Sequence, residues 1–459
     1  TMYKNLVRAA AAAWVSLSLV AAAPAGAQSA APAAAKPPLK VAFVYVSPVG
    51  TAGWTYQHNQ GRLGLEKNLG EAVKTTFVEN VAEGPDSERV MRDLAAQGHQ
   101  LIFATSFGYL EPALKVAQEF PDVAFEHMGG YKTGANVNVY NARFYEGRYL
   151  AGLVAGKMSR SGLAGYVAGF PIPEVVQGIN AFALGMRAAN PKAQVKVVWL
   201  NTWFDPAKER EAAQSLINDG ADMLTHHSGS TAIPALAEEN VARGVRLLGY
   251  QSDMRHVAPK AQLTSVTHHW GERYTAVARA VIAGTWKPQP FIGGVRERVI
   301  RMVPYAEEVP REVQRQLADV ERAMVAGRLH PFAGRLLDQD GQVIGVNVAR
   351  RVDVAHRDAD QLESRSRALA ELVAVRQQQR GYLAAHGARA QQRDAQMALI
   401  DHASPLSAVA DRSVVCRSRC APRSIPGSRA SRSSRRSPRT MTRACPSCTA
   451  TTGGRGTAL

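Results

Sequence analysis

Short apolar runs alternate with longer amphipathic stretches from residue 39 to about residue 340. The short runs are rich in valine, isoleucine, leucine and phenylalanine, as in VAFVYV (41–46), LIFAT (101–105) and VKVVWL (195–200). Between them, stretches such as SERVMRDLAAQG (87–98) repeat apolar residues at every third or fourth position, the spacing of a helix with one buried face. Short apolar strands separated by helices are typical of parallel sheets built from β-α-β units. We therefore predict an α/β fold with parallel sheets flanked by helices.

The alternation occurs in two successive series, which predicts two lobes. We assign residues 40–145 to the first lobe and residues 146–268 to the second. The amphipathic stretch GERYTAVARAVIAGTW (271–286) follows the second series, so we expect the chain to return to the first lobe. Residues 269–345 would include this return and complete the fold. The result is two three-layer lobes joined by crossing strands, with a ligand cleft between them.

The start of the chain has a different pattern. A basic segment, an alanine-rich apolar run and the small residues at 25–27 predict a secretory signal peptide over residues 1–27. The apolar run is short for a retained membrane anchor, which is the alternative interpretation. Residues 28–39 then form a flexible linker. Since no later apolar run reaches the roughly 18 residues of a membrane span, we expect a soluble protein exported to the periplasm.

The end of the chain carries most of the formal net charge of +17. Residues 351–459 hold 19 arginines, no lysine and 8 acidic residues, a balance of +11. We expect residues 346–459 to be an arginine-rich, disordered or aberrant tail, as an altered reading frame would produce. Binding of nucleic acid is electrostatically feasible for such a tail, but export argues against it as the function. We predict no nucleic-acid partner.

All the cysteines also lie in this tail. Their spacing approaches that of zinc ligands, but the surrounding residues lack the apolar positions and turns of a small folded zinc unit. We therefore expect no metal site here. The four cysteines are Cys416, Cys420, Cys445 and Cys448.

Aromatic and polar side chains follow five of the predicted strands. In open parallel sheets, ligands bind beyond the carboxyl ends of the strands, so these side chains are candidates for a site. A flat aromatic ligand would be held by rings stacked on its faces, with amides and carboxylates reading its edge. Trp270, in the segment that returns to the first lobe, is a further candidate. In strand order the others are Trp54 and Tyr56, Phe107, Phe170 and Glu174, Trp203, and Gln251 and Asp253.

Each of these residues also has a purely structural interpretation. Trp54 would cover the core of its own lobe, and Phe170 would be an ordinary packing residue. Glu174 would be an exposed acid in the first turn of a helix, and Asp205 before Pro206 is explained as a helix N-cap. The prediction of a site therefore depends on the coincidence of five strand ends, not on any one ring.

The motifs of common enzymes are absent from the sequence. We find no GxGxxG, P-loop, HExxH or GxSxG pattern, and no spacing that selects a Ser/His/Asp triad. The paired histidines at 226–227 and 268–269 are candidate metal ligands, but each pair ends or follows a strand, where one ring would face the core. We predict a non-catalytic protein without cofactor or metal.

Several segments, in this order, resemble the basic membrane protein (BMP) family of ABC-transporter solute-binding proteins. They include KVAFVYVSPVGTAGWTYQHNQG, LIFATSFGY, YNARFYEGRYLAGLVAGKMS, AGYVAGFPIPEVVQGINAFALGMRAANP, TWFDPAKEREAAQSLINDGAD and HPFAGRLLDQDG, and they span residues 40–341. The resemblance implies the two-lobed type I periplasmic binding protein fold, which closes on a ligand and delivers it to an ABC permease in the inner membrane. It is strongest to a branch that binds purine bases such as adenine. We expect a monomer.

Two departures from the family pattern bear on the ligand. Where nucleoside receptors of the family usually carry Asp and Phe in the first loop, this chain has Thr51 and Trp54, and it has Gln251 where they begin an Asp-Ser-Asp stretch. Those carboxylates would suit ribose hydroxyls, so their loss favours a free purine base over a purine nucleoside. Asp253 would then accept a hydrogen bond from the base.

The resulting hypothesis places a purine between Trp54 and a facing ring. That ring is Phe170 or Trp203, with Phe107 flanking the pocket, and the lobes hinge near residues 141–148 and 268–272. A receptor for sugar or another small solute is the alternative, although a sugar site would use more Asp, Asn and Arg than these loops offer. A transcription regulator of the same architecture would need a DNA-binding head and no export signal.

Overall fold

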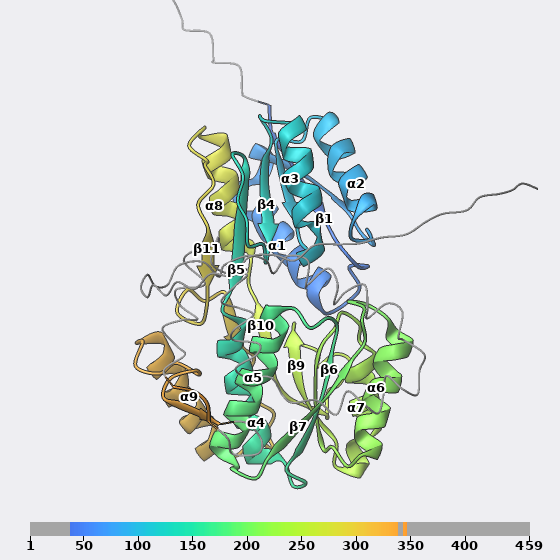
Figure 1. Ribbon diagram of the computed structural model, residues 1–459, viewed down its shortest axis with the longest axis vertical. Coiled ribbons are helices and arrows are strands. Elements are labelled where there is room, and N and C mark those ends of the chain that lie inside the picture. The colour runs from blue at the N-terminus through green and yellow to red at the C-terminus, as the bar shows by residue number, and fades with distance from the viewer. Residues whose placement is uncertain (1–36, 338–342, 347–459) are drawn as a thin grey trace, which may run out of the picture. The chain divides into compact units, whose positions relative to one another are not determined.

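The computed structural model describes residues 37–337 and 343–346, which form two six-stranded sheets and a small two-stranded one (Figure 1). The predicted signal peptide, residues 28–36 of the linker and the arginine-rich tail from residue 347, with its four cysteines, lie outside these residues. Within the described ranges, no helix combines the length and apolar character needed to cross a membrane.

The first sheet has the strand order β11-β5-β4-β3-β1-β2, and all its neighbouring strands are parallel. Every residue of β3 and β4 is buried, and β3 is accordingly a continuous apolar run, whereas β4 also buries Glu126 and His127. The strands are β1 (Leu39–Val44), β2 (Val73–Val78), β3 (Leu101–Ala104), β4 (Ala124–Met128), β5 (Val137–Ala142) and β11 (Phe291–Gly293).

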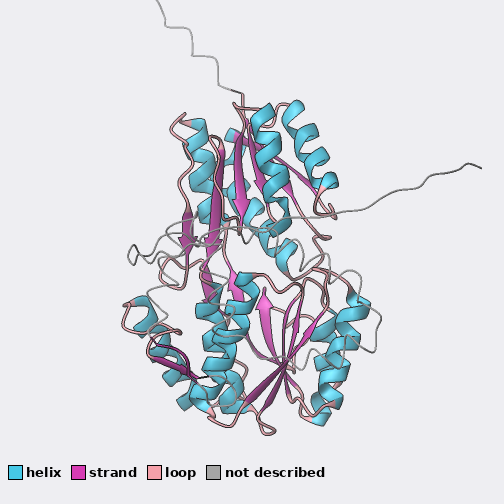
Figure 2. Cartoon of the chain, in the orientation of Figure 1, coloured by secondary structure: helices cyan, strands magenta, loops and turns pink. Residues whose placement is uncertain are grey.

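Helices cover both faces of this sheet (Figure 2). Successive residues of β1 point to opposite faces, so that Phe43 packs with side chains of α1 and α8 while Val44 packs with those of α2 and α3. The sheet is therefore the middle layer of a three-layer lobe, which we call the first lobe. Its helices are α1 (Trp54–Leu69), α2 (Pro85–Ala96), α3 (Leu110–Glu119) and α8 (Gly271–Ile282), with the short 3₁₀ turns Gly70–Ala72 and Phe107–Tyr109.

The second sheet has the order β12-β10-β9-β8-β6-β7 and belongs to the second lobe. Its strands are parallel except for β12, which is antiparallel to β10. The strands are β6 (Leu163–Ala168), β7 (Gln194–Trp199), β8 (Met223–His227), β9 (Arg246–Gln251), β10 (Gln262–His268) and β12 (Ile300–Met302). The helical segments are α4 (Phe144–Met158), α5 (Pro173–Ala189), α6 (Pro206–Asn218), α7 (Ala232–Glu239), the 3₁₀ turn Val241–Arg243 and α9 (Arg311–Val325), and the small sheet pairs β13 (Arg335–Leu337) with β14 (Val343–Val346).

The chain crosses between the two sheets three times within the described residues, after β5, after β10 and after β11. The crossings are hydrogen-bonded to one another, since Arg143 N–H donates to the Gly293 carbonyl (2.7 Å) and His269 N–H to the Val299 carbonyl (2.8 Å). Residues 269–337 are therefore shared between the lobes. α8 and β11 join the first lobe, whereas β12 and α9 join the second.

Candidate functional site

A cavity lies where segments from both lobes meet, and its roughly 510 Å³ of empty space includes part that is open to solvent. Its lining residues come directly after strands β1, β3 and β4 of the first lobe and β6 to β9 of the second, or at the ends of these strands. This is the position at which parallel α/β sheets bind ligands. The lining is formed by Val46, Ser47, Trp54, Ser106, Phe107, Met128 and Gly129 of the first lobe and Ile172, Glu174, Trp203, His227, Ser228, Gly229 and Gln251 of the second.

Two tryptophans line the cavity, one from each lobe. Trp54 is the first residue of α1, and its Nε1–H donates to the Thr105 carbonyl at 2.8 Å. Trp203 follows β7, donates Nε1–H to Glu83 Oε1 at 3.2 Å and packs edge-on against Phe170 (4.9 Å between ring centroids). Because both indole N–H groups have protein partners, what the two rings offer a ligand is apolar surface.

The two lobes touch each other beside this cavity. Gly53 N–H donates to Ser252 Oγ at 2.8 Å, and Thr51 Oγ1 lies 3.2 Å from His256 Nε2. Gly53 has φ of 95°, and a Cβ at this position would stand 2.5 Å from the Gly229 carbonyl oxygen, so only glycine permits the close approach. Together with the Trp203–Glu83 hydrogen bond, these contacts join the two lobes in an arrangement that is closed around the cavity.

Most polar groups of the lining are already used by protein partners. The three lining serines each hydrogen-bond another side chain: Ser47 with Thr55 (2.7 Å), Ser106 with Glu83 (2.6 Å) and Ser228 with Glu209 (2.8 Å). The side chains that remain available to a ligand are Glu174, His227 and Gln251, all from the second lobe. Among the residues that the structure describes, no lysine or arginine lines the cavity.

Glu174, in the first turn of α5, is the one carboxyl group in the lining, and 17% of its side chain is exposed. Burial raises the pKa of this carboxyl to about 8, although a hydrogen bond from Asn141 acts in the opposite direction. Burial, with a smaller effect from the positive charge of Arg148, holds the pKa of His227 well below its usual value. The 3.8 Å contact between Glu174 Oε1 and His227 Nε2 is therefore not an ion pair at neutral pH.

Gln251, the last residue of β9, has an unusual backbone conformation. Its φ is 73°, a left-handed conformation rarely adopted by residues other than glycine, and only 2% of the residue is exposed. Its Oε1 has no hydrogen-bond partner among the described residues. An unsatisfied buried oxygen on a strained backbone is a common feature of ligand-binding positions.

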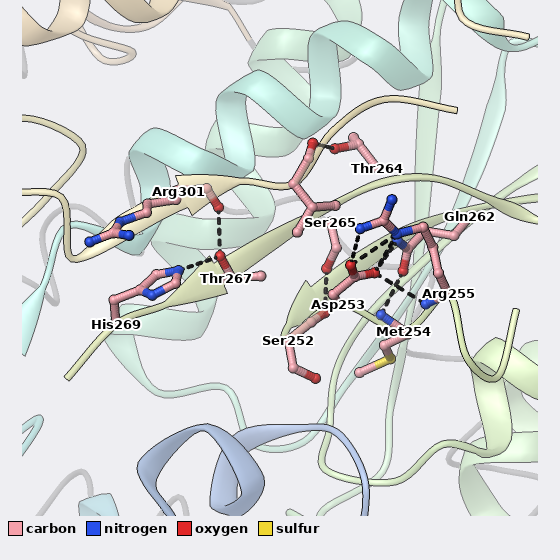
Figure 3. A network of polar contacts seen from close by, with 11 residues as sticks. Ser252, Asp253, Met254, Arg255, Gln262, Thr264, Ser265, Thr267, His269 and Arg301 are labelled. Carbon is pink, nitrogen blue, oxygen red and sulfur yellow. Dashed lines mark hydrogen bonds and ion pairs between the residues drawn. The ribbon is translucent and has the colours of Figure 1, made fainter. Parts of the chain in front are cut away.

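Five of the nine site residues suggested by the sequence line the cavity: Trp54, Phe107, Glu174, Trp203 and Gln251. The other four lie outside the lining. Tyr56 is a half-buried residue of α1, and Phe170 packs behind Trp203. Asp253 is held by Arg255 and by Gln262 Nε2 at 2.8 Å (Figure 3). Trp270 is 1% exposed in the core and stacks on His58 at 5.4 Å.

The lining also contains residues that strand-end reasoning passed over. His227 ends β8 and is followed by Ser228 and Gly229, and Met128 ends β4 and is followed by Gly129, so both groups occupy the positions that the strand rule selects. The sequence analysis did not select these residues because it favoured aromatic and charged side chains, and most of these residues are small or aliphatic. His226 and His268 are fully buried, and the described residues contain no group of three histidine, cysteine, aspartate or glutamate side chains arranged to hold a metal ion.

Comparison with known proteins gives a family and a fold. A family model described as ABC transporter substrate-binding protein, PnrA-like, matches residues 39–329. The chain is 50% identical over 303 residues to a purine-binding protein of Brucella abortus, covering 66% of this chain and 85% of that protein. It is 38% identical over 296 residues to a putative ABC transporter glucose-binding protein of Haloferax volcanii, covering 64% and 74% of the two chains.

Solved structures share the fold at lower identity. An ABC transporter solute-binding protein of Aeropyrum pernix matches with a TM-score of 0.57 and 17% identity, over 64% of this chain and 93% of that one. One from Conexibacter woesei matches with a TM-score of 0.53 and 24% identity, over 64% and 98%. With the two helix-flanked sheets, these likenesses confirm the predicted two-lobed type I binding-protein fold.

Proposed function

Since the chain belongs to the family of PnrA-like ABC transporter substrate-binding proteins, we propose that it binds a free purine base of the adenine type in the cavity between its lobes. The main support for the proposal is that the cavity lining consists of apolar walls and one side with polar groups. Rings and aliphatic side chains supply apolar walls, while uncharged Glu174, His227 and Gln251 supply hydrogen-bonding groups on one side. A flat, neutral ligand with a polar edge fits such walls.

The charges of the lining restrict the ligand class. Nucleotides and amino acids carry phosphate or carboxylate groups, which binding sites pair with arginine, lysine or backbone N–H groups. Because the cavity has no lysine or arginine in its lining, such anions would be buried without a cation. A neutral base has no such requirement. The Brucella relative, named as a purine-binding protein, supports the same ligand class.

A base is favoured over a nucleoside for a related reason. A ribose would add hydroxyl groups that need partners. Ser106 and Ser228 of the lining already donate to Glu83 and Glu209, so they could only accept hydrogen bonds from it. Gln251 Oε1 would instead accept a hydrogen bond from a ring N–H of the base. In a nucleoside, the glycosidic bond removes that N–H. Asp253, held by Arg255 and Gln262, takes no part in this arrangement.

A sugar is the second candidate, because one relative is named as a putative glucose-binding protein. Sugars also stack on tryptophan, but each of their hydroxyls needs a partner when buried. The lining offers three available polar side chains, which suit the edge of a base better than a ring of hydroxyls.

The proposed role is that of a receptor in the periplasm. The lobes would close on the base, and the closed form would deliver it to the permease of an ABC importer. The predicted signal peptide supports export. We propose that the protein acts as a monomer and has no catalytic role.

Calorimetric titration of the purified full chain tests the proposal. Adenine, hypoxanthine, guanine, adenosine and glucose are compared under the same conditions. We expect a dissociation constant on the order of micromolar or tighter for a free base, and weaker binding of adenosine and glucose. Preferred binding of adenosine would refute the argument from the serines and Gln251, and preferred binding of glucose would replace the proposed ligand class.

A further inference from the structure

Glu174 is a half-buried carboxyl group without a lysine or arginine partner among the described residues. The groups that face it are His227 of β8, Asn141 of β5 and the backbone at Gly129, where a Cβ would lie 3.6 Å from Glu174 Oε2. No lysine or arginine lies within ion-pair distance of it among the described residues. An ionised carboxylate in these surroundings would be costly, because only 17% of the side chain is exposed and no lysine or arginine compensates its charge.

The other charged groups near the cavity are occupied elsewhere. The Arg148 guanidinium of α4 lies 3.1 Å from the ring centre of Tyr250 and donates to Thr225 Oγ1 and the His226 carbonyl. Glu83, after β2, accepts hydrogen bonds from Ser106, Gly108 and Trp203. Among the described residues neither group forms an ion pair with Glu174, although Arg148 Nε has no hydrogen-bond partner.

Resting on the function proposed above, we propose that Glu174 binds the base as a neutral carboxylic acid. Its O–H donates to an unprotonated ring nitrogen of the purine, and its second oxygen accepts a hydrogen bond from the adjacent exocyclic amine. A carboxylate could only accept hydrogen bonds, whereas the acid both donates and accepts. The ligand class is thus an aminopurine whose edge places an acceptor beside a donor, as adenine does at N1 or N7 with its 6-amino group.

The ionisation of the neighbouring groups agrees with this assignment. Burial raises the pKa of Glu174 to about 8, so the acid is protonated at neutral pH before a ligand arrives. Burial, and to a smaller extent Arg148, lowers the pKa of His227, so this ring supplies no positive charge to stabilise the carboxylate. When the pH rises through about 8, Glu174 loses its donor. Affinity for the base should therefore fall above this pH.

Ligand analogues test the hydrogen bond without any mutation. Calorimetry on the full chain at about pH 6.5 compares adenine with 1-deazaadenine and 7-deazaadenine, each of which replaces one candidate acceptor nitrogen by C–H. We expect one of the two analogues to bind about tenfold or more weakly than adenine. Equal binding of all three compounds would overturn the role of Glu174 while leaving the binding of a purine base intact. Failure of every base to bind would overturn both proposals.

A matched pair of variants and a change of pH supply the second test. Glu174→Gln keeps a donor and an acceptor but cannot ionise, whereas Glu174→Ala removes both. We expect the Gln variant to bind adenine within about threefold of the native protein at about pH 6.5, and the Ala variant about tenfold or more weakly. Between about pH 6.5 and pH 9 the native protein should lose about tenfold in affinity and the Gln variant should not.

The Gln variant also corrects for titration of the ligand and of other protein groups. If Glu174→Gln binds adenine as weakly as Glu174→Ala, or if both native and Gln proteins show the same pH dependence, the inference is wrong.

Discussion

Trp54 shows how one side chain is prepared for a ligand. Its indole N–H is bound to the Thr105 carbonyl, and its ring meets His58 and His268 edge-on at 4.6 and 5.9 Å between centroids. The ring is therefore held in place by one hydrogen bond and by packing against neighbouring rings. A fixed aromatic wall binds a flat ligand without losing further conformational entropy.

We expect Trp54→Ala to weaken binding of the base by about 1–3 kcal/mol, because the mutation removes a stacking surface. Trp54→Phe should retain most of the affinity. Tyr56→Ala, on the same helix but outside the cavity lining, is the control. Calorimetry measures all three variants. An alanine variant with native affinity and reduced stability would make Trp54 a core residue only.

Glu174 should also affect stability as a function of pH. Its pKa is raised in the folded protein from 4.5 to about 8, so between these values the folded state binds more protons than the unfolded state. The contribution of Glu174 to the free energy of unfolding is therefore highest at low pH and is lost as the pH rises towards 8. We expect Glu174→Gln to be more stable than the native protein at about pH 8.5, by on the order of 1–4 kcal/mol, and this advantage to disappear near pH 5. Parallel pH profiles in chemical unfolding would contradict the raised pKa.

At the residue scale, the sequence located the strand ends but not the directions of their side chains. Gln251 and Asp253 are two positions apart, yet only Gln251 faces the cavity, because the Asp253 carboxylate is bound by Arg255 and Gln262 (Figure 3). Trp270 precedes α8 and lies in the core, where it stacks on His58. Such orientations depend on contacts between distant segments, which a strand pattern does not contain.

At the scale of elements, α4 and α5 pack unusually closely in the second lobe. A Cβ at Gly152 of α4 would stand 2.1 Å from the Phe182 carbonyl oxygen, and one at Gly185 of α5 would stand 2.1 Å from the Tyr149 carbonyl oxygen. The two helix backbones are thus in direct contact. Because α5 carries Glu174 and α4 follows the first crossing between the lobes, this packing positions one side of the site.

We expect Gly152→Ala to destabilise the protein by about 1–3 kcal/mol or more, since the backbone of α5 would have to move. Gly178→Ala is the matched control, because a Cβ there meets no atom closer than 3.5 Å and alanine favours the helix by up to about 1 kcal/mol. Chemical unfolding compares the two variants. Equal effects would show that the close helix contact does not limit stability.

The strands and helices themselves were largely predictable from the sequence. Buried parallel strands give uninterrupted apolar runs, and the helices beside them give amphipathic ones, as in residues 41–46 and 87–98. The antiparallel strand β12 was not predictable from the sequence. It is three residues long, and its place beside β10 depends on the crossings, where Arg143 pairs with Glu146 (2.7 Å) and Glu297. Ion pairs between segments about 150 positions apart leave no local pattern.

At the scale of the whole molecule, the lobes are joined beside the cavity by a few direct contacts. Glu83 of the first lobe accepts the Trp203 Nε1–H of the second, and it also fixes the loop that carries Phe107 through Ser106 Oγ and Gly108 N–H. Glu83 is not part of the cavity lining. It is therefore placed to stabilise the closed arrangement without touching the ligand.

We expect Glu83→Ala to speed the release of a bound base by about tenfold, because a trapped ligand leaves only when the lobes open. Stopped-flow dissociation measures the effect. Asp86→Ala is the control, since Asp86 lies on α2 and 61% of its side chain is exposed. Unchanged release from the Glu83 variant would mean that the Glu83–Trp203 contact does not control opening.

The family was predictable from the order of its sequence segments, and the match over residues 39–329 confirms it. The closed contacts were less predictable, because they join loops whose spacing in the sequence carries no information about distance. Gly53 illustrates this point: its contact with Gly229 connects residues of different lobes. The proposed hinge segments, residues 141–148 and 268–272, include two of the crossings between the lobes.

The most direct test of the binding site is a crystal structure of the full chain grown with adenine. We expect the base in the cavity between the lobes, in contact with Trp54 on one face and with Glu174 at its edge. Adenine bound elsewhere, or in the cavity without contact to either residue, would contradict the proposed site.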